Sequence, residues 1–264
     1  MAGPAVADRG GHPAGDAALA RWLAVRAGAR LLRLRTARGH ADPLALGDAG
    51  DQLSHRFLVR ALRRLRPDDW VLSEEGDQRE PGRLTAERVW IVDPLDGTRG
   101  YREPGRTDWA VHVALWTRAG GLTAGAVALP AQQRVLATDR PPVPSIPARR
   151  RPRLVVSYSR PPAYAEAVAA AIGAELGTLG SAGAKVAAVI TGEYDAYLHD
   201  GGQYEWDSAA PVAVARAVGL HASRLDGSPL RYNQPDPYLP DLLVCRPELA
   251  APLMAAVVAH RLPE

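Results

Sequence analysis

The sequence predicts a mixed α/β (α+β) protein organised in two halves, and three observations support this prediction. Apolar residues recur at helical spacing in several segments, such as 16–38. Short runs of β-favouring residues, such as Val89–Val92, alternate with those segments and indicate strands. A proline-rich stretch divides the chain. We therefore expect a disordered tail at 1–15, an N-terminal α+β subdomain at 16–140, a Pro/Arg-rich linker at 141–152 and a C-terminal α/β subdomain at 153–264.

The N-terminal half is expected to begin with two helices and to continue as strands. The first helix covers 16–38, and the second covers 52–65. Asp51 is well placed as the N-cap of the second helix, because an aspartate can accept hydrogen bonds from the first free N–H groups. Pro94 should end the strand that begins at Val89, since proline cannot donate to a central ladder. The other strands are predicted at 69–72 and 108–116, with a hairpin over 122–129 and 133–137.

The C-terminal half is expected to alternate strands and helices. Ser181 follows a glycine and should open a helix, and Asp207 has the position of an N-cap for a helix that runs to Val218. The remaining strands are predicted at 154–157, at 194–199 and around Val244, with helices at 162–172 and around Leu253.

Composition excludes several classes of protein. The 264 residues carry 32 basic and 29 acidic side chains, a net charge of +3, which does not indicate a nucleic-acid partner. Cys245 is the only cysteine, so the chain cannot form an internal disulfide, and a reducing cytoplasm is the expected location. We find no signal peptide and no apolar run of about 20 residues, so no membrane association is expected.

Two carboxylates end the strand that begins at Val89. Asp93 and Asp96 are three residues apart, and the Leu95 carbonyl can face the same way. Three oxygen donors in a short turn suit a hard divalent cation such as Mg²⁺. The N–H groups of Gly97 and Thr98 follow and can bind a phosphate. Taken alone, the pair also fits an ordinary turn after a strand, in which acidic residues and glycine are common.

Three separated motifs make the sequence resemble a known family. The segment Trp90–Thr98 contains Asp-Pro-Leu-Asp-Gly-Thr, the pair Glu74–Glu75 lies upstream, and Trp206–Asp207 lies downstream. In this order they are similar to the motifs of the inositol monophosphatase-like, lithium-sensitive phosphatases. Ser157–Arg160 and Asp226–Asn233 resemble segments of the bacterial 3′(2′),5′-bisphosphate nucleotidase branch of that superfamily. Gly100 departs from the family, which usually has Asn or Glu there.

The resemblance implies a fold, a set of metal ligands and an assembly. The fold would be a five-layered αβαβα sandwich whose two subdomains hold the metals between them, with most ligands from the N-terminal one. Two or three Mg²⁺ ions would be bound per site, Li⁺ would inhibit, and a homodimer would be common. The implied metal ligands are Glu74, Asp93, the Leu95 carbonyl, Asp96 and Asp207.

The resemblance also implies catalytic and substrate-binding residues. Asp51 and Thr98 would together position the attacking water and accept its proton. The implied substrate contacts are Gly97, Thr98, Arg160, Ser181, Lys185 and Asp200.

The expected activity is therefore hydrolysis of a small phosphate ester by metal-activated water. The nucleotidase-like segments favour adenosine 3′,5′-bisphosphate, cleaved to AMP and phosphate, with a role in sulfate assimilation. Inositol monophosphate is the alternative substrate, with fructose bisphosphate as a further one. A second alternative is a protein of a different class, a binding protein that senses a nucleotide or RNA. The complete set of carboxylates favours an enzyme.

Overall fold

The computed structural model describes residues 12–77, 81–143 and 151–261. Within these residues the strands form two five-stranded sheets. The first has the order β1-β2-β3-β4-β5 and lies in the N-terminal half; the second has the order β7-β6-β8-β10-β9 and lies in the C-terminal half. Most of the predicted linker and disordered tail, at 144–150 and 1–11, lies outside the described residues.

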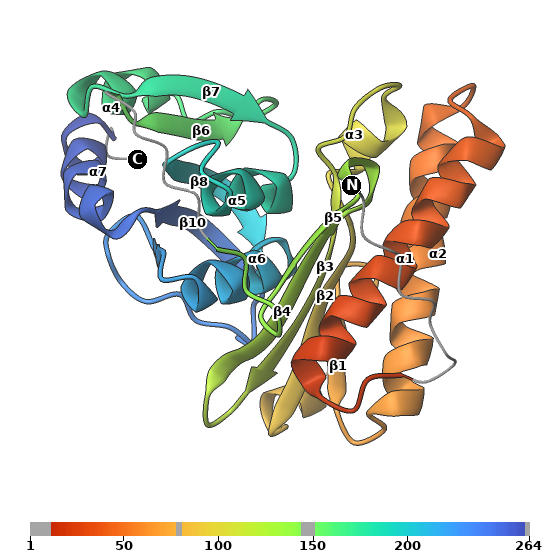
Figure 1. Cartoon of the computed structure of the whole chain (residues 1–264). Coiled ribbons are helices and arrows are strands. Elements are labelled where there is room, and N and C mark those ends of the chain that lie inside the picture. The colour runs from red at the N-terminus through yellow and green to blue at the C-terminus, as the bar shows by residue number, and fades with distance from the viewer. Residues whose placement is uncertain (1–11, 78–80, 144–150, 262–264) are drawn as a thin grey trace.

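Helices and sheets stack in five layers (Figure 1). Helices α1 (Asp16–Arg38) and α2 (Pro43–Leu65) cover the outer face of the first sheet. Helices α5 (Ala182–Ile190) and α6 (Glu205–Ala217) lie between the two sheets, and α4 (Ala165–Ala171) and α7 (Pro247–His260) cover the far face of the second. Three buried apolar clusters fill the spaces between these layers. The αβαβα sandwich expected from the sequence is confirmed.

The first sheet is mixed. Strands β1 (Trp70–Ser73) and β2 (Arg88–Asp96) pair in parallel, and antiparallel pairing continues through β3 (Ala110–Thr117), β4 (Gly121–Leu129) and β5 (Arg134–Ala137). Residues 89–95 of β2 are all buried, as expected for a central strand covered on both faces. Helix α3 (Thr98–Arg102) follows β2 directly, and short 3₁₀ turns occupy Pro81–Leu84 and Pro130–Gln132.

In the second sheet, β6 (Arg153–Ser157) lies between β7 (Glu175–Leu179) and β8 (Ala196–Tyr204) and is parallel to both, and β8 is the central strand. Strand β10 (Tyr238–Cys245) pairs antiparallel with β8 and with the short β9 (His221–Ser223). The sequence did not predict β7 or β9. In β7, Gly and Thr separate the two leucines and no residue is buried, and β9 has only three residues, so neither has the apolar run that marks a buried strand.

Two predicted helix starts are wrong. Helix α2 begins nine residues before Gln52, at Pro43, and Asp42 is its N-cap, accepting from Ala45 N at 3.0 Å. Asp51 therefore lies inside the helix, because the Asp-Pro pair provides both a cap and a pre-set first residue. Helix α6 begins at Glu205 with Tyr204 as N-cap. Asp207 is the third helical residue, and its side chain accepts from Tyr204 N at 2.7 Å, as the acidic residue of a capping box does.

One predicted strand end is also wrong. Strand β2 continues past Pro94 to Asp96, and its pairing with β3 shifts between Asp93 and Asp96. Pro94 thus stands at a bulge, where its missing N–H costs no ladder hydrogen bond.

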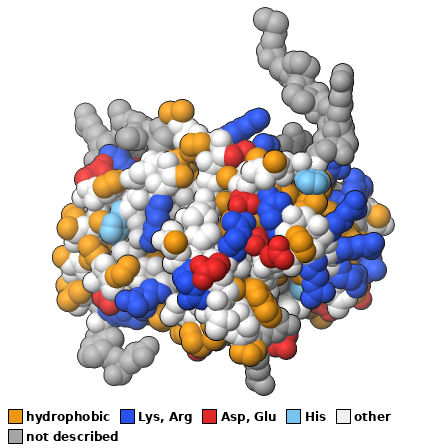
Figure 2. Space-filling view, turned by 90° about the horizontal axis from the view of Figure 1, so that it is seen from below, with side chains coloured by type: hydrophobic (Ala, Val, Ile, Leu, Met, Phe, Trp, Pro, Cys, Tyr) orange, Lys and Arg blue, Asp and Glu red, His pale blue; other side chains and the backbone are white. Residues whose placement is uncertain are grey.

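Arginine side chains gather on the outer helical layer, toward the right of Figure 2. They line a groove between α1 and α2, and Arg30 stacks 3.8 Å above the Phe57 ring while Arg26 lies 5.1 Å from the centre of the Trp22 ring. In the part of the chain that the structure describes, no helix is long and apolar enough to span a membrane.

The first sheet packs closely against α6 at Gly125 of β4. A Cβ atom at this position would lie 2.6 Å from Ala213 Cβ and 3.0 Å from the Ala210 carbonyl oxygen. The missing side chain therefore lets the middle helical layer pack directly on the sheet.

We expect Gly125→Ala to lower the free energy of unfolding by about 1–3 kcal/mol, because the added methyl group overpacks this contact. Chemical denaturation of the wild type and the variant measures the change. Adding Ala213→Gly should relieve part of the clash, so the double variant should lose less stability than the sum of the two single variants. Additive losses would show that the contact at Ala213 does not limit the packing.

Candidate functional site

The bulge in β2 presents three oxygen donors at the end of a rigid central strand. The side chains of Asp93 and Asp96 are 1% and 6% exposed. Asp93 Oδ1 accepts from Leu95 N at 3.0 Å, which fixes the carboxylate in the turn. Gly97 follows with φ +82°, and a Cβ there would lie 2.8 Å from Ser181 Cβ. Only glycine therefore allows the turn both its left-handed backbone and its approach to Ser181.

The Asp96 carboxylate joins the two halves of the molecule. Its Oδ1 accepts from Ala182 N at 3.2 Å, and its Oδ2 accepts from Gly183 N at 2.7 Å, both in the first turn of α5. His112 Nε2 of β3 lies 3.1 Å from the same Oδ2, while His112 Nδ1 donates to the Trp206 carbonyl at 3.1 Å. A negative charge at a helix N-terminus is favourable.

This environment sets the charge of Asp96. Burial would raise the pKa of the carboxyl group, but His112, the Gly183 N–H and Lys185 outweigh it and hold the pKa below its usual range. Asp96 is thus ionised at neutral pH, in spite of being almost completely buried.

Three further carboxylates, those of Glu74, Asp93 and Asp207, converge beside Asp96. Ligand atoms of Asp93, Asp96 and Asp207 all lie within 4.8 Å of one another. Burial and the charges of Asp207 and Asp51 raise the pKa of Glu74 to about 8. Burial and the charge of Asp96 raise the pKa of Asp207 to about 6. Burial and the charges of Glu74 and Asp96 raise the pKa of Asp93 well above its usual range.

These shifts indicate an unsatisfied excess of negative charge. Like charges this close disfavour one another's ionisation unless a cation is bound. An all-oxygen donor set of carboxylates suits a hard divalent cation of the Mg²⁺ or Mn²⁺ type. The residues present therefore fit a metal site, and the structure brings together the four carboxylates that the sequence proposed as ligands.

Asp51 and Thr98 meet beside this cluster. Thr98 Oγ1 lies 3.4 Å from Asp51 Oδ1 and 3.1 Å from the Leu95 carbonyl oxygen. Burial, followed by the charge of Glu75, raises the pKa of Asp51 to about 7. A carboxyl group with this pKa can take up and release a proton at neutral pH.

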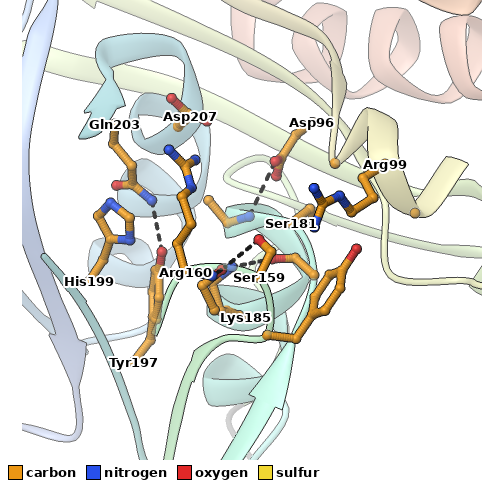
Figure 3. A pocket seen from close by; sticks show the side chains of 16 residues that line it. Asp96, Arg99, Ser159, Arg160, Ser181, Lys185, Tyr197, His199, Gln203 and Asp207 are labelled. Carbon is orange, nitrogen blue, oxygen red and sulfur yellow. Dashed lines mark hydrogen bonds between the residues drawn. The ribbon is translucent and has the colours of Figure 1, made fainter. Parts of the chain in front are cut away.

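A polar cavity of about 330 Å³ opens next to the cluster. Its lining includes four of the predicted substrate contacts, Gly97, Arg160, Ser181 and Lys185, together with Asp96 and Asp207 (Figure 3). Ser181 is the N-cap of α5, as predicted, and accepts from Ala184 N at 2.9 Å. Lys185 donates to the Gly180 carbonyl and lies over the Tyr197 ring; burial lowers its pKa to about 8.

Two predicted substrate contacts, Thr98 and Asp200, do not line the cavity; Thr98 lies beside Asp51, whereas Asp200 is held elsewhere. The Asp200 carboxylate accepts from Tyr164 Oη at 2.6 Å and from Arg261 at 2.9 Å. Both partners hold it near α4 and α7.

Sequence reasoning missed four residues of the site: His112, Tyr197, His199 and Gln203. His112 lies in mid-strand between two valines, a pattern that predicts a core histidine and not a site residue. Burial was predicted correctly, since its side chain is fully buried, but its contact with Asp96 depends on sheet register. For Tyr197 and His199 of β8, the alternation of side chains along the predicted strand could have shown that both lie on one face of the sheet.

We expect Glu74→Gln to stabilise the metal-free protein at pH 8 on the order of 1 kcal/mol and to have little effect at pH 5. The folded-state pKa of Glu74 is raised, so its contribution to stability is complete below its unfolded value and is lost as the pH rises toward about 8. Glutamine removes the charge and therefore that loss. Thermal unfolding with a chelator at both pH values measures this effect.

Glu87→Gln is a matched control, because Glu87 is a largely exposed glutamate whose partner is Arg118 on the surface. It should show no such pH-dependent gain. Equal stability of the Glu74→Gln variant and the wild type at pH 8 would contradict the predicted repulsion.

Comparisons with known proteins agree with this geometry. The model of the inositol monophosphatase family matches residues 24–141 and 148–261. A relative from Mycobacterium leprae, named 3′-phosphoadenosine 5′-phosphate phosphatase, is 51% identical over 259 residues, covering 92% of this chain and 93% of the relative. The 3′(2′),5′-bisphosphate nucleotidase CysQ of Escherichia coli K12 is 30% identical over 202 residues, covering 72% and 81%.

Solved structures show the same fold. CysQ from Bacteroides thetaiotaomicron, described as a bacterial member of the inositol monophosphatase family, superposes with a TM-score of 0.73 at 27% identity, covering 85% of this chain and 94% of that one. Inositol monophosphatase II from Staphylococcus aureus superposes with a TM-score of 0.74 at 21% identity, covering 92% and 97%. The motifs, the fold and the family match together show that the chain belongs to the inositol monophosphatase family.

Proposed function

We propose that the protein is a Mg²⁺-dependent phosphomonoesterase that hydrolyses adenosine 3′,5′-bisphosphate to AMP and phosphate. The observation that carries the proposal is the position of a cationic cavity directly beside the carboxylate cluster. The cluster suits the scissile 3′-phosphate, and Arg160 and Lys185 give the cavity positive charge for a second phosphate. The similarity to 3′-phosphoadenosine 5′-phosphate phosphatases over nine-tenths of both chains supports this substrate.

Glu74, Asp93, Asp96, Asp207 and the Leu95 carbonyl would hold the metal ions. Bound Mg²⁺ supplies positive charge for the phosphoryl and leaving oxygens and lowers the pKa of water. Two or three ions per site and inhibition by Li⁺ follow from the family resemblance.

The chain's own residues then orient the reactants. When Thr98 donates to Asp51 Oδ1, the lone pairs of its hydroxyl oxygen are free to accept a hydrogen bond from the attacking water. Asp51 takes the proton that leaves through Thr98, which its pKa of about 7 allows near neutral pH. The N–H groups of Gly97 and Thr98 bind phosphate oxygens at the turn before α3. The phosphate is thereby held between the turn and the cluster.

The substrate contacts proposed are Gly97, Thr98, Arg160, Ser181 and Lys185. Asp200 is a weaker candidate, because Tyr164 and Arg261 already occupy its carboxylate. A homodimer, a cytoplasmic location and a role in sulfate assimilation remain predictions that follow from the resemblance and from the lone cysteine.

The test is release of phosphate in the presence of Mg²⁺ from adenosine 3′,5′-bisphosphate, inositol 1-phosphate and fructose 1,6-bisphosphate, with and without Li⁺. We expect kcat/KM for the nucleotide to exceed that for inositol 1-phosphate by roughly 100-fold, because the cavity matches a second phosphate. Asp96→Asn is the inactive control, since it removes a carboxylate that is part of the metal cluster and accepts hydrogen bonds from α5.

Other outcomes separate the alternatives. A preference for inositol 1-phosphate would agree with the metal chemistry but contradict the proposed nucleotide substrate. Nucleotide binding without Mg²⁺ and without turnover would indicate a binding protein instead. Full activity of the Asp96→Asn variant would contradict the assignment of the metal ligands.

A further inference from the structure

One wall of the cavity is built by three side chains of β8 that have no role in the proposed reaction. Tyr197, His199 and Gln203 line the cavity and are 0%, 3% and 5% exposed. We call them the β8 wall. In Figure 3 they stand together on the side of the cavity opposite Arg99.

Two polar atoms of this wall lack a partner. Gln203 Nε2 donates to Tyr197 Oη at 2.7 Å, which leaves the Gln203 carbonyl oxygen, Oε1. Among the residues that the structure describes, neither Gln203 Oε1 nor His199 Nε2 has a hydrogen-bond partner, although both atoms are buried. Buried polar groups in proteins are nearly always hydrogen-bonded. Two exceptions side by side on a cavity wall therefore indicate a ligand that supplies the missing bonds.

A bulge in β8 lies directly before Gln203. Between the pairs Asp200–Asp241 and Gln203–Leu239, β8 has one residue more than β10. Gly201 and Gly202 occupy the bulge with φ values of +84° and +86°, which a side chain would disfavour. Bulges are common next to functional sites. The tyrosine hydroxyl holds the Gln203 amide in place.

The β8 wall is neutral, in contrast to the rest of the cavity. Burial, followed by the charges of Lys185 and Arg160, lowers the pKa of His199 to about 3, so its ring carries no charge at neutral pH. Burial also raises the pKa of Tyr197 well above its usual range, so its hydroxyl stays protonated. Phosphate groups are bound best by cations. The neutral wall instead suits an uncharged group that donates and accepts hydrogen bonds.

We propose that Gln203 and His199 bind the nucleoside part of the substrate, through a sugar hydroxyl or the amino edge of the base, and thereby select nucleotides over other phosphate esters. The proposal rests on the proposed function and extends it. Gln203 Oε1 accepts the donated hydrogen bond, and His199 pairs with the same group or with its neighbour. Tyr197 is a positioning residue that fixes the Gln203 amide.

The test compares substrates that each lack one candidate group. Gln203→Met keeps the length of the side chain but cannot accept a hydrogen bond. We expect it to lower kcat/KM for adenosine 3′,5′-bisphosphate by about 10–100-fold, mainly through KM. Release from p-nitrophenyl phosphate, which has no nucleoside, should stay within about twofold of the wild type. Gln132→Met, at an exposed glutamine, is the matched control and should change neither rate.

Two analogues identify the group that is bound. The 2′-deoxy analogue lacks the sugar hydroxyl, and the inosine analogue replaces the amino group of the base with an oxygen that only accepts. The wild type should discriminate against one of them, and Gln203→Met should abolish that discrimination. If the ratios for both analogues are the same in the wild type and the variant, the proposal is overturned.

A second variant and a second measurement keep the outcome distinct from the proposed function. His199→Phe preserves the ring packing and should weaken the same discrimination if Gln203→Met does not fold. Calorimetric binding of AMP does not need turnover, and each variant should weaken it at least about tenfold. An inactive wild type whose AMP binding depends on Gln203 would overturn the phosphatase function but keep the nucleoside site. Unchanged AMP binding in both variants would overturn the site alone.

Discussion

The contact between the Asp96 carboxylate and the first turn of α5 is the interaction on which the site depends. The carboxylate lies at the end of a central strand in one half of the molecule. The backbone N–H groups of Ala182 and Gly183 in the other half donate hydrogen bonds to it. The same carboxylate lies within the metal-ligand cluster. One ionised group therefore holds the two halves at a fixed distance and completes the site between them. The helix dipole and His112 help to keep it charged in a buried position.

The remaining carboxylates of the cluster differ from Asp96 in that their pKa values are raised. Glu74, Asp93 and Asp207 have raised pKa values because burial and the neighbouring negative charges outweigh the hydrogen bonds and positive charges near them. Such a cluster is a cost to the metal-free fold, which a divalent cation offsets on binding. Functional sites commonly store unfavourable electrostatics of this kind. The cavity beside the cluster also has two different sides. Arg160 and Lys185 give one side positive charge, and the β8 wall on the other side is neutral.

The sequence predicted most helices, the central strands and the carboxylate ligands, because apolar periodicity and the motif Asp-Pro-Leu-Asp-Gly-Thr are local signals. It misplaced features that depend on neighbours. Asp51 was predicted as a helix cap, although Asp42 and Pro43 start the helix earlier. Pro94 was expected to end a strand that continues as a bulge. His112 and Gln203 were not identified, since His112 contacts Asp96 through cross-strand register and Gln203 lies in the part of β8 beyond the strand predicted at 194–199. Asp200 followed from resemblance alone, and here Tyr164 and Arg261 bind it.

The central claim, that Asp96 builds the metal site by its bonds to α5, is tested most directly by Mg²⁺ titration calorimetry on the Ala182→Pro variant. Ala182 is the first residue of α5, where proline is tolerated, and Ser181 before it already has an extended backbone with ψ 156°. The substitution replaces the N–H that donates to Asp96 Oδ1 with the Cδ atom of proline, which forces the carboxylate away from α5. The account predicts Mg²⁺ affinity about tenfold or more weaker in the folded variant. Unchanged Mg²⁺ affinity in the folded variant would contradict it.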